Sequence, residues 1–169
     1  MIRIRSIVAR LRRLGNQRGL SLVELASVSA ILVIMAGVTY PVANTMVKRQ
    51  KELELRRALR TIRTALDRFQ EDTVRYPGIR VKYLNRANEE GYPEDLELLY
   101  KGVDIGDAGG TVLKYLRRLP LDPITGEREW DTRSSRDDPK SSFSDGINIF
   151  DVRSKSDKIG LDGIRYSKW

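Results

Sequence analysis

The sequence predicts an α+β protein in which one long N-terminal helix, membrane-spanning in its first half, packs against short helices and a small antiparallel β-sheet. Residues 25–47 carry no charged side chain, and residues 55–69 place apolar side chains at helical spacing. The rest of the chain consists of short β-branched and aromatic clusters between turn residues. The segments predicted from these patterns are 1–19, 20–47, 48–76 and 77–169.

The first segment, residues 1–19, is strongly basic, with six arginines and no acidic residue. The whole chain has 31 lysines and arginines against 23 acidic residues, a net charge of +8. Removing the six arginines leaves 25 basic residues, which nearly balance the acidic ones. The excess charge therefore belongs to this segment, and we expect it to face an anionic membrane surface rather than nucleic acid.

The second segment, residues 20–47, is predicted to cross a membrane, because its uncharged run is long enough for a hydrocarbon core of about 30 Å. The three cations of residues 48–51 are partly offset by Glu52 and Glu54, whereas the N-terminal arginines are not. The positive-inside rule therefore predicts a cytoplasmic N-terminus and an exported remainder. A secretory signal would have a shorter apolar run, and a simple single-pass anchor is the alternative.

Glu24 is the one acidic residue at the head of this apolar run. A carboxylate there costs on the order of 2–3 kcal/mol on insertion scales and therefore calls for a partner. The positions three and four residues ahead are Ser27 and Val28, so this helix supplies no cation. A cut between Gly19 and Leu20 would create an α-amino group that a neighbouring, axially shifted helix could present to this carboxylate. We therefore interpret Glu24 as a subunit-assembly residue.

The stretch GLSLVEL, residues 19–25, resembles the class III signal of type IV pilin-like proteins. The resemblance implies that residues 1–19 are a prepilin leader, that a prepilin peptidase cuts after Gly19, and that Leu20 becomes the N-methylated first residue. Leu20 departs from the family's usual phenylalanine, which bears on the efficiency of methylation. Pro41 occupies the family's proline at mature position twenty-two. Together with Gly37 it weakens the helical hydrogen-bond ladder, so we expect a helix kink there.

The third segment, residues 48–76, is predicted to be the amphipathic half of the same helix. Its apolar stripe is formed by Leu55, Ala58, Leu59, Ile62, Ala65, Leu66 and Phe69. Glu52 with Arg56 and Glu71 with Arg75 stand four residues apart, each pair contributing about 0.2–0.5 kcal/mol, and predict the solvent-facing side. The sequence RYPG predicts the helix end near residue 75, because proline disfavours helical geometry at the preceding residue.

The fourth segment, residues 77–169, is predicted to be a globular α+β domain. Leu113, Leu116 and Leu119 share one face of a predicted helix that Pro120 ends. The predicted helices are 92–102 and 109–120. The predicted strands are 146–154, 163–169 and one that follows a turn within 122–130 and runs through Trp130.

This segment resembles the major, G-type pseudopilin of type II secretion, in the pieces RYP, YPEDLELL, LRRLPLDPITGEREW and IFDVRSKSDKIGLDG. The resemblance implies a structural subunit that leaves the bacterial inner membrane, joins a helical periplasmic filament, and drives protein export. It also implies four kinds of partner: copies of the chain itself, minor pseudopilins, the prepilin peptidase and an inner-membrane assembly platform. The alternative is a type IV pilin or minor pilin of a pilus used for adhesion, motility or DNA uptake.

Several members of that family bind calcium in the loop before the last strand, where aspartates, serines and carbonyl groups supply the oxygens. Calcium requires six to eight oxygen ligands, and the loop RSKSDKIGLDG offers side-chain oxygens. Lys155 and Lys158 stand where the related loops favour glycine or acidic residues, so a polar turn is the alternative. The candidate calcium ligands are Ser154, Ser156, Asp157 and Asp162.

The composition argues against an enzyme. The chain has no cysteine and no histidine, so it has neither a disulfide framework nor the usual general base near neutral pH. The pairs Asp137 with Asp138 and Ser21 with Glu24 lack such a base or an oriented nucleophile. The acidic run of residues 136–146, which also contains Asp145, is interpreted as a surface loop.

Two further functions fit less well. A pilin that captures DNA would need a basic patch, and the candidates Lys114, Arg117 and Arg118 are better explained as the solvated face of a helix, so no nucleic-acid partner is expected. A minor pilin at the filament tip has less need of a carboxylate that catches an amine above it. Glu24 therefore favours the shaft or a position below the tip.

Overall fold

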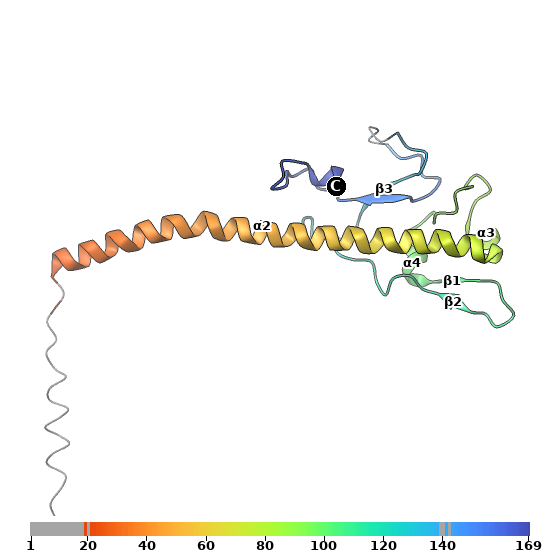
Figure 1. Ribbon diagram of the computed structural model, residues 1–169, viewed down its shortest axis with the longest axis horizontal. Helices are drawn as coiled ribbons and strands as arrows, with labels where there is room; N and C mark the ends of the chain where they lie inside the picture. Colours follow the sequence, from red (N-terminus) through yellow and green to blue (C-terminus); the bar gives the residue numbers. More distant parts are fainter. Residues whose placement is uncertain (1–18, 20, 139–140, 142) are drawn as a thin grey trace, which may run out of the picture. The chain divides into compact units, whose positions relative to one another are not determined.

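The computed structural model describes residue 19, residues 21–138, residue 141 and residues 143–169 (Figure 1). Most of the predicted leader and Leu20 lie outside the described residues. The described chain is α+β, as predicted, with one long helix, short helices and small antiparallel sheets. It divides into two compact units, Met1–Thr45 and Met46–Trp169.

Helix α2, Leu22–Arg75, is the predicted long helix. Its start follows from local sequence, because the Ser21 hydroxyl accepts the Val23 N–H at 3.4 Å and the Ser21 carbonyl accepts the Leu25 N–H at 2.9 Å. Its end is at the predicted residue, since Tyr76 has extended geometry (φ −122°, ψ 90°) before Pro77.

The part of α2 in the first unit is apolar and exposed. Leu22 is 84% exposed and Val33 is 72% exposed, although both are large hydrophobic residues. The helix assignment includes Pro41, whose side chain lies outside the description, and the kink there stays a prediction.

The second unit has its own hydrophobic core, built on the remaining part of α2. All seven residues of the predicted apolar stripe are at most 9% exposed. The stripe continues by one step at each end through two buried polar residues, Glu52 and Thr73. The buried apolar residues outside α2 that complete this core are Ile79, Leu96, Leu99, Val103, Leu116, Trp130, Ile149, Val152 and Tyr166.

Two short helices follow α2. Helix α3, Pro77–Tyr83, begins at the proline because the first turn of a helix does not need that residue's N–H. Helix α4, Glu97–Lys101, confirms the second half of the helix predicted at 92–102 and ends at Gly102, whose φ of 98° favours glycine.

The helix predicted at residues 109–120 is wrong. Strand β2, Val112–Leu113, pairs antiparallel with β1, Val103–Asp104. The N–H groups of Tyr115 and Leu116 then both donate to the Leu99 carbonyl, at 3.0 and 2.9 Å. The leucine spacing that suggested a helix is therefore produced by β2 and an irregular segment after it, whose hydrogen bonds go to other elements.

The second sheet pairs β3, Asp131–Arg133, with β4, Asp151–Arg153, in antiparallel register with Thr132 opposite Val152. Both strands are shorter than predicted, and β3 starts just after residues 122–130 rather than within them. The strand predicted at 163–169 is wrong, because this segment contains the 3-10 helix η2, Tyr166–Lys168. In Figure 1, β3 lies on one side of the second unit's part of α2, and α4, β1 and β2 lie on the other.

Candidate functional site

The first candidate site is the start of α2. Glu24 lies in its first turn, three residues after Ser21, in the Ser-x-x-Glu pattern of a capping box. A carboxylate among free N–H groups at a helix start is stabilised by about 0.3–1 kcal/mol by the helix dipole. The pattern therefore predicts a local role for Glu24 at the helix start. The sequence analysis missed this role, although the capping pattern was readable.

Gly19 is exposed, and the structure has no atom within 4 Å of the position that a Cβ there would take. A side chain at residue 19 would therefore meet no obstacle within the described part of this chain. Leu20, the predicted methylation site, lies outside the described residues. Cleavage after Gly19 and methylation of Leu20 stay predictions.

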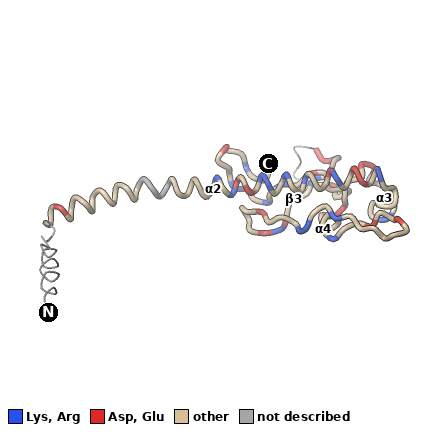
Figure 2. The backbone as a smooth tube through the Cα atoms, turned by 60° about the horizontal axis from the view of Figure 1, so that its bottom comes forward, with Lys and Arg blue, Asp and Glu red and all other residues tan. Residues whose placement is uncertain are grey.

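The exposed apolar part of α2 is the second feature of this site. Among the described helices, α2 alone is long and apolar enough to cross a membrane, near the N-terminus, and none of its most apolar stretch is buried. In Figure 2 the backbone of the first unit is tan between the acidic residue of its first turn and the charged residues of the second unit, apart from a short grey stretch. This composition and exposure suit a hydrocarbon surrounding.

The second candidate site joins α2 to the last part of the chain, and we call it the C-terminal clasp: Lys48, Glu52, Arg56 and Arg63 with the residues they contact in 151–169. Glu52 is 6% exposed. Its carboxylate accepts the Leu161 N–H at 2.7 Å and the Tyr166 hydroxyl at 2.9 Å. The predicted solvent-facing pair of Glu52 and Arg56 is therefore wrong. Burial, together with the Glu52 carboxylate, raises the pKa of Tyr166 to about 12, so its hydroxyl remains a donor.

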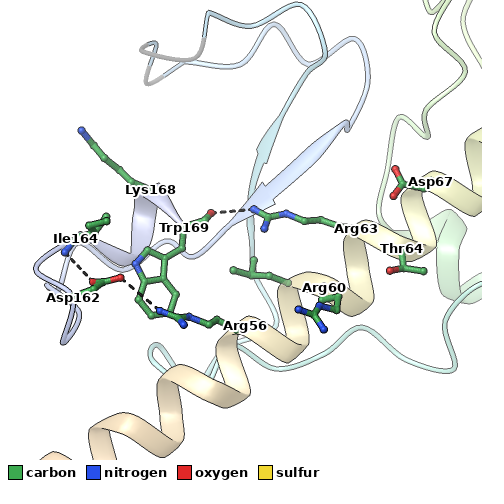
Figure 3. Close-up of a pocket in the computed structure, with 10 residues that line it drawn as sticks. Arg56, Arg60, Arg63, Thr64, Asp67, Asp162, Ile164, Lys168 and Trp169 are labelled. Carbon is green, nitrogen blue, oxygen red and sulfur yellow. Dashed lines mark hydrogen bonds and ion pairs between the residues drawn. The ribbon is translucent and has the colours of Figure 1, made fainter.

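The two arginines of the clasp hold the chain's last residues (Figure 3). The Arg56 guanidinium lies 4.4 Å from the Trp169 ring centroid and 3.6 Å from Asp162. Arg63 donates to the Asp151 carboxylate at 2.6 Å and to the Val152 and Trp169 carbonyl groups at 3.1 and 3.0 Å. Both arginines line a cavity of about 520 Å³ with the Trp169 ring. The clasp therefore fixes the segment 151–169 on α2.

Changing Tyr166 to phenylalanine is expected to destabilise the second unit by about 1.5–3 kcal/mol, because a buried carboxylate loses a hydrogen-bond donor. Tryptophan fluorescence during urea unfolding of the full chain in detergent measures this change. Tyr100→Phe is the matched control, since that hydroxyl donates at 3.3 Å to the exposed Glu97, and its expected effect is below about 0.5 kcal/mol. Equal losses in both variants would contradict the clasp.

The candidate calcium ligands have protein partners in this structure. Asp157 accepts the Ser167 hydroxyl at 3.0 Å and lies 3.8 Å from an arginine, and Asp162 accepts the Ile164 N–H at 3.0 Å and faces Arg56. Ser154 and Ser156 lie together, since the Ser156 N–H donates to the Ser154 hydroxyl at 3.1 Å. Within residues 21–138, 141 and 143–169, no three acidic side chains gather as metal ligands. Calcium binding stays a prediction.

Asp122 is a buried polar residue that the sequence analysis did not single out. It is fully buried, accepts the Ser154 hydroxyl at 2.5 Å and accepts the Ile124 N–H at 2.7 Å. It thus ties the turn before β3 to the residue that follows β4. The Ser154 hydroxyl proton is therefore directed to a carboxylate. An aspartate followed by proline is a turn signal, but its burial depends on β4, which is distant in sequence.

The remaining predicted site residues lie in irregular structure. Asp137 accepts the N–H groups of Ser134 and Asp145 at 2.8 and 3.0 Å, which confirms a loop for the described part of 136–146. Asp138 follows it in the same loop. The candidate DNA-binding cations, Lys114, Arg117 and Arg118, are exposed, but they follow β2 rather than lying on a helix.

Comparisons with models of protein families, with curated proteins and with solved structures found no match for this chain. The fold and these sites define a class of protein: chains that have an exposed apolar helix and an α+β unit with its own hydrophobic core.

Proposed function

We propose that this chain is a membrane-anchored structural subunit of a helical filament of the type IV pilin-like class, and not an enzyme. The observation that carries the proposal is the exposed apolar part of α2, which has a single carboxylate, Glu24, in its first turn. An exposed apolar helix is stable in lipid or against other apolar helices. The bilayer supplies the lipid, and a filament of identical chains later supplies the other apolar helices.

The packing of the second unit supports this proposal. Its buried stripe on α2, residues 55–69, is covered by the chain's own elements. The unit therefore does not need the first unit for its core, and the first unit's apolar surface remains free for lipid and for neighbouring copies. A subunit with a membrane helix requires this arrangement, in which one unit forms its own core and the other presents an apolar surface.

In its finer form, the proposal is a pseudopilin of type II secretion. The chain would cross the bacterial inner membrane once, with residues 1–19 cytoplasmic and the α+β unit periplasmic, and would pass into a periplasmic filament that drives protein export. Its partners would be further copies of the chain, minor pseudopilins, the prepilin peptidase and an inner-membrane assembly platform. Support comes from the motifs at residues 19–25.

A simple single-pass anchor is the competing function, and the Ser-x-x-Glu pattern at the start of α2 favours it, because the pattern gives Glu24 a use within its own helix. If Glu24 serves only as a helix cap with Ser21, its charge is not needed for assembly. Glutamine also completes a capping box, so Glu24→Gln separates the two functions.

Replacing Gly19 with valine is expected to leave essentially all of the chain uncut, with its leader attached. The structure has no atom near the new side chain, so the effect would arise at the peptidase rather than in this chain's own fold. Intact mass and N-terminal sequencing of membrane-extracted protein measure the outcome, and the unchanged chain should begin at a methylated Leu20. Gly15→Val, the same change inside the leader, is the control and should be cut normally. A mature N-terminus at Leu20 in Gly19→Val would refute the cleavage site.

A further inference from the structure

The first part of α2 in the second unit is strongly basic on its solvent-facing side. Residues 48–63 contain seven lysines and arginines and two acidic residues. These residues follow the apolar run 25–47 directly in sequence.

The structure removes one of the two acidic residues from this surface. Glu52 is buried in the C-terminal clasp, where its carboxylate is bound by Leu161 and Tyr166. Helical spacing would otherwise pair it with the cations three or four residues away, such as Arg49 and Arg56. Glu54 remains as the one exposed carboxylate of residues 48–63. The clasp thus leaves this surface more positive than the sequence alone indicates.

Most of the cations are available to a partner. Arg49, Lys51, Arg57 and Arg60 are exposed and have no ion pair with the described residues. Lys48 donates to the Ile159 carbonyl, which leaves its charge uncompensated. Arg56 contacts the Trp169 ring and Asp162 and remains 59% exposed at its side chain.

We propose that these six residues form a basic collar that binds the phosphate groups of anionic phospholipids where α2 leaves the bilayer. The collar consists of Lys48, Arg49, Lys51, Arg56, Arg57 and Arg60. The inference rests on the membrane-spanning part of the proposed function and is independent of filament assembly.

The reach of these side chains supports lipid as the partner. At about 1.5 Å per residue, Lys48, Arg49 and Lys51 lie within about 6 Å of the end of the apolar run, which is the depth of a headgroup layer. Arg56 and Arg57 lie about 15 Å from it. Arg56 is held at Asp162 and the Trp169 ring, so it and the other distant arginines of this group contribute through their electrostatic potential, which extends about 8–10 Å at physiological salt. Each cation near an anionic surface strengthens binding by about fivefold.

The test uses the full chain in vesicles made of equal parts phosphatidylglycerol and phosphatidylcholine. Native mass spectrometry after mild detergent extraction counts the lipids that remain bound to each chain. The unchanged chain is expected to retain phosphatidylglycerol preferentially, and the preference should weaken in high salt. Arg49→Gln with Lys51→Gln and Arg57→Gln is expected to reduce the preference by at least about tenfold.

The control is Arg68→Gln with Arg75→Gln and Arg86→Gln, which removes the same charge from exposed residues farther along the chain. It should retain the preference. Three results would overturn the collar. The unchanged chain could retain both lipids equally, or the two triple variants could lose the preference equally. In the third result, an acidic peptide alone would displace phosphatidylglycerol. Flotation of each variant with the vesicles tests membrane anchoring separately. A failure of lipid binding at the collar can therefore be distinguished from a failure of the membrane span. A chain that does not float would overturn both the membrane span and the collar.

Discussion

Changing Glu24 to valine is expected to permit cleavage after Gly19 but to reduce incorporation into filaments by about 10- to 100-fold. The reason is that the neighbouring subunit's amine would lose a charged partner in an apolar surrounding, where such a hydrogen bond contributes about 1.5–3 kcal/mol. The amount of the subunit in filaments sheared from cells, relative to the amount in the membrane, measures this effect.

Glu24→Gln decides between the two roles of this side chain. Glutamine can still complete the capping box with Ser21, but it carries no charge. Assembly through charge predicts that glutamine fails as valine does, and capping alone predicts that glutamine behaves like the unchanged chain. Glu54→Gln, which removes an exposed carboxylate elsewhere on α2, is the control and should assemble normally. Normal filament yield from both Glu24 variants would refute the assembly role.

Changing Phe69 to alanine is expected to destabilise the second unit by about 3–5 kcal/mol. Phe69 is fully buried, and its ring meets Tyr115 edge to face at a centroid distance of 5.5 Å. The loss combines the transfer of the ring to water with the cavity that remains. Domains of this kind are stable by about 5–15 kcal/mol, so a large share of the folding free energy would be lost. Urea unfolding followed by tryptophan fluorescence measures the change.

Val74→Ala is the matched control for this prediction, because Val74 lies on the same helix and is 71% exposed. Its expected effect is below about 0.5 kcal/mol. Phe69→Ala should also leave membrane insertion unchanged, because it alters the second unit alone. A loss of less than about 1 kcal/mol in Phe69→Ala would contradict the assignment of residues 55–69 as the centre of the core.

The long helix and its buried stripe were predictable because they depend on local periodicity. From Leu55 to Phe69, spacings of three and four place one side of a helix against any apolar surface, whatever that surface is. Proline at position 77 likewise determines the helix end through its effect on Tyr76 alone. Features of this kind can be predicted without knowing which residues lie nearby in the folded structure.

The errors have the opposite cause. Residues 109–120 have leucines at helical spacing, but Tyr115 lies in irregular structure, where its N–H donates to the Leu99 carbonyl and its ring contacts Phe69. Glu52 has an arginine four residues ahead, but its partners are more than one hundred positions away. Sequence spacing shows which partners lie close along the chain. Tertiary contacts determine which partners a residue has in the folded structure.

The position of the clasp in the sequence also constrains the order of events during synthesis. Glu52 and Tyr166 are 114 positions apart, and at about 5–20 residues per second their synthesis is separated by roughly 6–23 s. During that interval the core-facing stripe of α2 has been made but its final covering has not. A nascent chain in this state presents an apolar helix face that stays partly uncovered until the last residues arrive.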